Sequence, residues 1–278
     1  MIDSGSADPV GTSTAAVTDE LGRFRLDGRV AIVTGATGGI GSRLAEALSR
    51  VGARIAVHGR DESRAAGLTE RLSGEGAEAV PVVADLTRRE EADRMVEQTL
   101  AAFGRVDVIV NTVGGGAGTA LYPAEAYPED EWDRIMDLNL RSTVLPTAAA
   151  ARAMIAGGQG GRVLHLSSVR GQLGIDNGFS AYVAAKGALD ALTRQQATEW
   201  AKHRITVNAL SPTFVATAQT ASLLADEEFR AGLERRIPLG RIAGTDDVVG
   251  AALLLCSDAS SFITGQVLTL DGGLTACQ

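Results

Sequence analysis

Residues 29–41 read RVAIVTGATGGIG, and this stretch decides the fold. Its apolar first half predicts a short strand that is buried on both faces, and residues 40–51 have the pattern of a helix. Between them, Gly35, Gly39 and Gly41 let the chain turn sharply and let its backbone approach a pyrophosphate. The free N–H groups at the start of the helix favour the same anion. The stretch therefore predicts a dinucleotide-binding strand, turn and helix, although tight turns also need glycine for their own geometry.

Apolar runs alternate with helical patterns along the rest of the chain. Runs that are apolar throughout indicate burial on both faces of a sheet. The alternation predicts an α/β fold, namely a single-domain, Rossmann-like, doubly wound parallel sheet flanked by helices. No linker or internal repeat divides the chain, so we expect one domain over residues 26–278 after a flexible extension at residues 1–25. Further strands are expected at 54–58, 79–83, 106–110, 163–166, 206–209 and 267–270, with helices at 62–72 and 88–103.

The composition excludes several classes of protein. The chain has 278 residues, of which 45% are apolar, which is enough for one α/β domain with a well-buried core. Its formal net charge of -8 argues against a general nucleic-acid or phospholipid surface. No run of about 18 apolar residues offers a membrane span, and the N-terminus lacks the features of a signal peptide. We therefore expect a cytoplasmic protein with no nucleic-acid or membrane partner.

The cysteines and histidines do not predict a metal site. Cys256 and Cys277 form no CxxC pair, so a disulfide framework or structural zinc site is not expected, and both are interpreted as ordinary thiols. The three histidines also lack metal-ligand spacing. We interpret His165 as lying inside a strand, and His58 and His203 as surface or rim residues.

Two short polar motifs suggest acid–base chemistry. Tyr182 and Lys186 are four residues apart on a predicted helix, so they share one face. A free tyrosine has a pKa near ~10, and a nearby ammonium would lower that pKa. Ser168 follows a predicted strand, at the edge where parallel sheets bind ligands. The alternatives are a surface Tyr–Lys pair and a serine that caps the next turn, and we favour the capping role for Ser167.

Together these segments resemble the classical short-chain dehydrogenase/reductase family, from about Leu26 to Gly273. The resemblance is specific because several motifs occur in the family's order along the chain. The matching motifs are the glycine turn, Asp85, Asn111 with Gly114, Asn139, Ser168, Tyr182 with Lys186, Asn208–Pro212, Thr217 and Asp271–Gly273. Taken singly, three of these residues are also compatible with purely local roles: Asp85 could cap a helix, Asn139 could be a buried polar group that bonds backbone, and Thr217 could be a helix N-cap.

The resemblance implies an NAD(P)(H)-dependent oxidoreductase that interconverts a secondary alcohol and a ketone without a metal. Tyr182 would be the general acid or base, and Lys186 would lower its pKa and hold the nicotinamide ribose. Ser168 would polarise the substrate oxygen, and Asn139 would support a water that relays protons to Lys186. Contacts with the cofactor are expected at Gly35, Thr37, Gly39, Ile40, Gly41, Arg60, Asp85, Leu86, Asn111, Gly114, Pro212, Val215 and Thr217, besides Tyr182 and Lys186.

The resemblance leaves the substrate open, with a polyol, a sugar acid or a 3-oxoacyl group as candidates. Residues 214–241 are expected to cover the substrate. A homotetramer is also implied, with residues 132–154 and 182–200 at its interfaces, although their Ala-rich faces could pack within one subunit. The alternative function is a nucleotide-binding sensor or scaffold without turnover.

Residues after the second predicted strand favour NADP(H) over NAD(H). An NAD-preferring site normally places a carboxylate here to bind both ribose hydroxyls, and Gly59 stands at that position. Arg60 follows and can offer a planar donor fork to a 2′-phosphate. Asp61 is interpreted as the N-cap of the next helix, although a shifted alignment would make it the ribose ligand. Gly38 weakens the prediction, because many NADP-preferring relatives have a basic residue there.

The sequence departs from the family pattern near the nicotinamide end. Thr112-Val113 replaces the usual Asn-Ala, two extra glycines follow Gly114, and Thr213 stands where glycine commonly follows the proline. The segment from Ser168 to Tyr182 is one residue longer than the commonest spacing. These departures bear on the shape of the substrate site rather than on the four catalytic positions.

Overall fold

The computed structural model describes residues 19–115, 120–176 and 178–276. Within them, seven strands form one parallel sheet in the order β3-β2-β1-β4-β5-β6-β7. This confirms the predicted fold class. The strands are β1 (Val30–Thr34), β2 (Arg54–Gly59), β3 (Ala79–Val83), β4 (Val108–Asn111), β5 (Gly161–Leu166), β6 (Ile205–Pro212) and β7 (Val267–Leu270).

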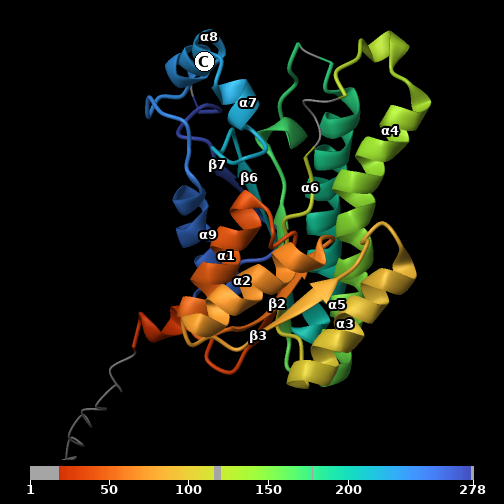
Figure 1. Ribbon diagram of the computed structural model, residues 1–278, viewed down its shortest axis with the longest axis vertical. Helices are drawn as coiled ribbons and strands as arrows, with labels where there is room; N and C mark the ends of the chain where they lie inside the picture. Colours follow the sequence, from red (N-terminus) through yellow and green to blue (C-terminus); the bar gives the residue numbers. More distant parts are fainter. Residues whose placement is uncertain (1–18, 116–119, 177, 277–278) are drawn as a thin grey trace, which may run out of the picture.

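Helices cover both faces of the sheet (Figure 1). One core cluster joins the sheet to α1, α2 and α9, and the other joins it to α3, α5 and α6. The helices are α1 (Gly39–Arg50), α2 (Glu62–Gly74), α3 (Arg89–Phe103), α4 (Glu129–Met136), α5 (Ser142–Gly157), α6 (Ser180–Trp200), α7 (Ala221–Leu224), α8 (Glu227–Arg236) and α9 (Val249–Cys256).

Strand β1 shows why a continuous apolar run was required. Successive side chains of a strand point to opposite faces, so Ala31 and Val33 enter one core cluster while Ile32 enters the other. All five residues of β1 are buried. The strand order reverses between β1 and β4, and ligands of open α/β sheets bind at such a reversal, outside the carboxyl ends of the strands.

The domain begins close to the predicted boundary. Leu26 is 3% exposed, and its backbone N–H donates to the carbonyl of Val51. Just before it, a guanidinium nitrogen of Arg23 donates to the carbonyl of Asp258 at 2.9 Å. Of the extension predicted at residues 1–25, residues 1–18 lie outside the described residues, and residues 22–24 form a 3-10 turn.

A π-helical turn, Asp137–Arg141, joins α4 to α5. Such turns insert one extra residue into a helix and are frequent at functional sites. Here the turn contains Asn139, whose side chain is fully buried. None of the helices in the described residues is long and apolar enough to cross a membrane.

Candidate active site

The glycine turn between β1 and α1 forms a cradle of close backbone contacts. Gly35 has φ +66°, which side chains disfavour. A Cβ atom at Gly41 would lie 2.2 Å from the Gly35 carbonyl oxygen, and one at Gly39 would lie 2.8 Å from Cγ2 of Thr217. The glycines thus keep the turn bare of side chains beside the N-terminus of α1. This arrangement fits a pyrophosphate, which needs close approach to backbone N–H groups.

His58 lies directly behind this turn, so its interpretation as a surface or rim residue was wrong. It is the penultimate residue of β2 and is 2% exposed. Its Nδ1 accepts a hydrogen bond from the Gly35 backbone N–H at 3.0 Å, and its Nε2 lies 3.0 Å from the carbonyl oxygen of Ala84. Burial lowers its pKa, so the ring stays neutral. A sequence signal existed: Ile55, Ala56 and Val57 form an unbroken apolar run directly before His58, which is typical of a strand buried on both faces.

At the end of β2 the structure brings the glycine turn and α2 together. Asp61 is the N-cap of α2, because its carboxylate accepts the backbone N–H of Arg64 at 3.0 Å. This confirms the capping interpretation. The side chain of Arg64 reaches back and donates to the Thr37 carbonyl oxygen at 2.5 Å, a contact that the sequence did not reveal. Arg60 is exposed between them. Its charge is one of the weaker causes that lower the Asp85 pKa, behind the hydrogen bond from Thr87.

Three predicted cofactor residues direct their side chains into the protein. Asp85 accepts hydrogen bonds from the backbone N–H and hydroxyl of Thr87, at 3.1 and 2.8 Å, as a cap would. Leu86 is 2% exposed and belongs to a core cluster, so only its backbone could face a ligand. Asn111 donates to the Thr147 hydroxyl at 2.9 Å and lies 3.2 Å from Nδ1 of His165.

The segment after β4 packs closely against two predicted catalytic residues. Gly114 has φ +155°, and a Cβ atom there would lie 2.9 Å from Oδ1 of Asn139 and 3.4 Å from Nζ of Lys186. Thr112, which departs from the family pattern, donates to the Thr34 carbonyl oxygen at 2.6 Å. It thereby ties this segment to the end of β1.

The side-chain amide of Asn139 forms hydrogen bonds with backbone groups. Its Oδ1 accepts the Gly115 N–H at 2.8 Å, and its Nδ2 donates to the carbonyl oxygens of Gly115 and Ile135, both at 3.0 Å. The side chain therefore joins the π-helical turn to the segment after β4. This is the buried, backbone-bonding arrangement that the sequence left open as an alternative.

The capping role predicted for Ser167 belongs to its neighbour. Ser168, not Ser167, caps the following turn, Val169–Gly171, by accepting the Arg170 backbone N–H at 3.2 Å. Ser167 instead donates to a carboxylate oxygen of Asp190 at 2.5 Å. The reason is direction: side chains alternate at the end of a strand, so neighbouring serines point to opposite sides.

Tyr182 and Lys186 share one face of α6, as predicted. The Lys186 ammonium lies 5.6 Å from the centre of the Tyr182 ring and donates to the Leu166 carbonyl oxygen at 2.8 Å. It therefore lies at the carboxyl end of β5, close to where Ser168 follows.

Burial has the largest effect on the pKa of Tyr182. Burial raises this pKa, and the causes that oppose the rise are the hydroxyl of Ser168 and the charge of Arg170. Burial also lowers the pKa of Lys186 to about 8, against the charge of Asp190.

The predicted cover begins after β6. Val215 is 4% exposed and pairs with Ala243 in an isolated bridge, so its side chain is internal. Within the cover, Phe214 and Phe229 meet edge to face, with 5.6 Å between ring centres. This contact connects the end of β6 to α8. Pro212 is the last residue of β6, and the methyl group of Thr217 faces the glycine turn.

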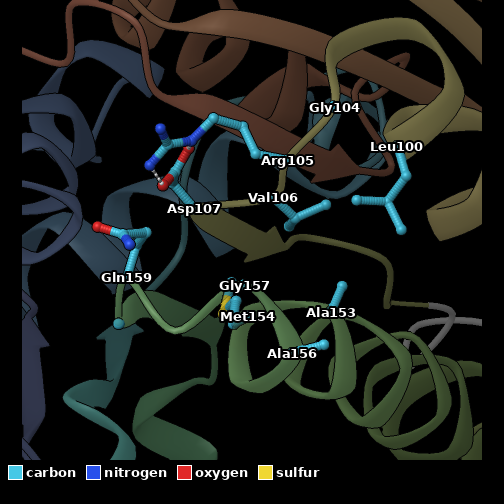
Figure 2. A pocket seen from close by; sticks show the side chains of 11 residues that line it. Leu100, Gly104, Arg105, Val106, Asp107, Ala153, Met154, Ala156, Gly157 and Gln159 are labelled. Atoms are coloured by element: carbon cyan, nitrogen blue, oxygen red, sulfur yellow. Dashed lines mark hydrogen bonds and ion pairs between the residues drawn. The ribbon is translucent and has the colours of Figure 1, made fainter.

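A separate cavity of about 400 Å³ lies at the amino-terminal end of the strands, next to the start of β4 (Figure 2). It is lined by the ends of α3 and α5 and by the ion pair between Arg105 and Asp107, 2.6 Å apart. Asp107 also accepts the backbone N–H of Val30 at 2.9 Å, so this pair holds the start of β1. The predicted catalytic side chains all lie towards the carboxyl end of the strands. Among the described residues, no cluster of His, Cys, Asp and Glu could hold a metal ion.

Comparison with known proteins identifies the family. A family model described as "Enoyl-(Acyl carrier protein) reductase" matches residues 35–275. The chain belongs to the short-chain dehydrogenase/reductase family. The description of that model names one activity within the family. As a short-chain dehydrogenase/reductase, the protein is an NAD(P)-dependent oxidoreductase that interconverts secondary alcohols and ketones.

Three relatives give the scale of the similarity within the short-chain dehydrogenase/reductase family. An uncharacterized oxidoreductase of Mycobacterium tuberculosis is 41% identical over 262 residues, which are 92% of this chain and 95% of the relative. Gluconate 5-dehydrogenase of Gluconobacter oxydans is 37% identical over 252 residues, covering 91% and 96%. A crystal structure of gluconate 5-dehydrogenase from Burkholderia cenocepacia, in complex with NADP and tartrate, has a TM-score of 0.88 and 36% identity. It covers 93% of this chain and 99% of that chain.

Proposed function

We propose that this protein prefers NADP(H) and interconverts a secondary alcohol and a ketone in a polyhydroxy carboxylic acid, a sugar acid. The observation that carries the chemistry is the position of Tyr182 and Lys186 on one face of α6, beside the end of β5 that Ser168 follows. The sugar-acid substrate is supported by the relatives, since gluconate 5-dehydrogenase of Gluconobacter oxydans is similar over nearly its whole length.

In this proposal the protein residues handle one proton. In reduction Tyr182 gives its phenolic proton to the substrate oxygen, and in oxidation its phenolate takes that proton. The hydroxyl of Ser168 donates a hydrogen bond to the same oxygen. A bound nicotinamide dinucleotide supplies the hydride donor or acceptor. Lys186, with a pKa of about 8, carries a positive charge at neutral pH and binds the ribose, and Asn139 supports a water that leads towards it.

The preference for NADP(H) rests on the end of β2. Asp61 caps α2 through Oδ1, which turns its carboxylate towards the start of that helix. Gly59 has no carboxylate to offer, and a Cβ atom there would lie 2.6 Å from Cγ2 of Thr37. Arg60 can present a planar donor fork to a 2′-phosphate, and Arg64 adds a second positive charge beside Thr37.

Steady-state kinetics with both cofactors test this function. D-Gluconate and 5-keto-D-gluconate serve as the acid pair, and wild type is compared with Arg60→Ala. We expect kcat/KM to favour NADPH over NADH, and Arg60→Ala to reduce that ratio about tenfold. Arg50→Ala is the matched control, because Arg50 is also exposed but lies at the far end of α1. An enzyme that uses NADH at least as well as NADPH contradicts the preference, and cofactor binding without turnover on a broad panel favours the sensor or scaffold.

We also propose a cytoplasmic homotetramer. Its interfaces would involve α4 and α5 on one side and α6 on the other, within residues 132–154 and 182–200. Light scattering coupled to gel filtration measures the mass of the assembly directly. A mass of one or two chains at micromolar concentration contradicts the tetramer and leaves the chemistry untouched.

A further inference from the structure

Arg170 is a buried cation whose charge has no acidic partner among the described residues. It belongs to the turn Val169–Gly171 that Ser168 caps, and it is 7% exposed. One guanidinium nitrogen donates to the carbonyl oxygen of Gly174 at 3.1 Å. None of the ion pairs in the described part of the chain includes it. A guanidinium has five N–H donors, and burying its charge without a counter-ion is costly.

Arg170 lies next to a predicted catalytic residue, because its backbone N–H donates to Oγ of Ser168 at 3.2 Å. Its charge favours the phenolate of Tyr182, and the phenol in turn favours the charged guanidinium. The other charged group that acts on it is Arg236, at the C-terminal end of α8 in the cover. Arg170 and Arg236 therefore come from different elements and are near enough for their charges to interact. Like charges repel, and an anion bound between them would remove that repulsion.

We propose that Arg170, together with Arg236 of the cover, binds a carboxylate of the substrate, so that the site takes an anionic polyhydroxy ketone or alcohol in preference to a neutral one. The proposal deepens the proposed function and rests on it, because it names the residues that select the acid. A guanidinium fork matches a carboxylate with two parallel hydrogen bonds. Since Arg236 comes from the cover, binding the anion also links closure of the cover to the presence of substrate.

A purely structural role for Arg170 is the competing hypothesis. Its bond to Gly174 holds residues 171–174, so a variant could weaken every substrate equally. The two roles differ in selectivity: a carboxylate contact affects acids alone, whereas a loop support affects acids and neutral compounds together. An acid and a neutral compound of the same chain length, compared within each variant, therefore decide between them.

The test combines matched ligands with matched variants of the full-length enzyme and NADPH. 5-Keto-D-gluconate and fructose are compared as substrates. Tartrate and threitol, which share a four-carbon chain, are compared as competitors. For Arg170→Gln we expect KM for the keto acid and Ki for tartrate to rise tenfold or more, while the values for fructose and threitol change less than twofold. Arg236→Gln should show the same selectivity with a smaller rise, and Arg170→Lys should recover part of the loss.

Arg235→Gln is the control for Arg236→Gln, because it removes the same charge from the neighbouring exposed position of α8. It should change neither acid nor neutral ligands. An equal loss on acids and neutral compounds in Arg170→Gln would overturn the carboxylate contact and leave the sugar-acid function standing. A wild-type enzyme that prefers fructose to the keto acid would overturn the sugar-acid function itself, and with it this inference.

Discussion

The imidazole of His58 accepts a hydrogen bond from the backbone N–H of Gly35, at 3.0 Å through Nδ1. Its other nitrogen, Nε2, lies 3.0 Å from the Ala84 carbonyl oxygen and must donate to it. Only the neutral Nε2–H tautomer satisfies both contacts. Gly35 opens the glycine turn and Ala84 precedes Asp85, so one buried ring fixes two segments of the predicted dinucleotide site relative to each other.

Replacing His58 by leucine should weaken cofactor binding more than the chemical step. The variant leaves the partly buried Gly35 N–H without its acceptor, and an unsatisfied buried donor costs up to about 1–3 kcal/mol. We expect the Kd for NADPH to rise about tenfold, with kcat at saturating NADPH within about threefold of wild type. Fluorescence titration and steady-state kinetics measure the two effects. His203→Leu, at a half-buried position remote from the turn, is the control; an unchanged Kd in His58→Leu would refute the positioning role.

The sheet could be predicted from sequence because its strands are apolar throughout and its first turn is rich in glycine. Pattern and motif order also located Tyr182, Lys186 and Ser168, since these lie at strand ends or at helical spacing. His58 was missed because a polar residue near the end of a strand resembles a rim residue when its partners, Gly35 and Ala84, are distant in sequence.

Other features were missed because they depend on side-chain direction. Ser167 and Ser168 are identical in type, and only the alternation of the strand decides which one caps the turn. Arg170 resembles a solvated loop cation until the fold buries it beside Tyr182. The π-helical turn at Asn139 has no local sequence signature, because it depends on packing against the segment after β4.

Tyr182→Phe should remove nearly all turnover while leaving cofactor binding intact. The ring stays in place beside Lys186, and only the transferable proton is lost. We expect kcat/KM to fall by at least about a hundredfold, which corresponds to about 3 kcal/mol of transition-state stabilisation. Single-turnover kinetics with NADPH measure the loss, and fluorescence titration monitors binding. Activity within a few fold of wild type would contradict the acid–base assignment.

His165 should make the fold sensitive to acid. It is 1% exposed, its Nε2 lies 3.1 Å from Oε1 of Gln196, and burial lowers its pKa from 6.5 to about 4. As the pH falls below 6.5, the unfolded chain takes up a proton that the folded protein does not. The stability contributed by the neutral ring is therefore complete above pH 6.5 and is lost between pH 6.5 and 4. The loss amounts to about 3 kcal/mol.

Urea unfolding between pH 7.5 and 4.5 measures this dependence. The variant His165→Gln no longer titrates, so its free energy of unfolding should fall less steeply with pH, although its stability at pH 7.5 is also lower. His58 has the same sign of pKa shift and remains in both proteins, so it cancels in the comparison. Parallel pH profiles for wild type and variant would show that His165 does not carry the effect.

Gly59→Asp should destabilise the protein without making it NADH-dependent, because the new side chain would collide with the side chain of Thr37. A Cβ atom at Gly59 would lie 2.6 Å from Cγ2 and 3.0 Å from Oγ1 of Thr37, and both approaches are too close for a side chain without a shift. Relief requires the Thr37 side chain to rotate or its backbone to move, and the guanidinium of Arg64 holds that backbone by donating to its carbonyl oxygen. We expect Gly59→Asp to cost about 1–3 kcal/mol of stability in the absence of cofactor, as overpacking does. It should also weaken NADPH binding without creating efficient use of NADH.

Thr37→Ala removes both crowding atoms, so the double variant should recover at least half of the lost stability. Thr37→Ser, which removes only Cγ2, should recover less. Urea unfolding of the four proteins in a double-mutant cycle measures the coupling between the two positions. If the costs of Gly59→Asp and Thr37→Ala simply add, Thr37 does not decide which residues the end of β2 accepts.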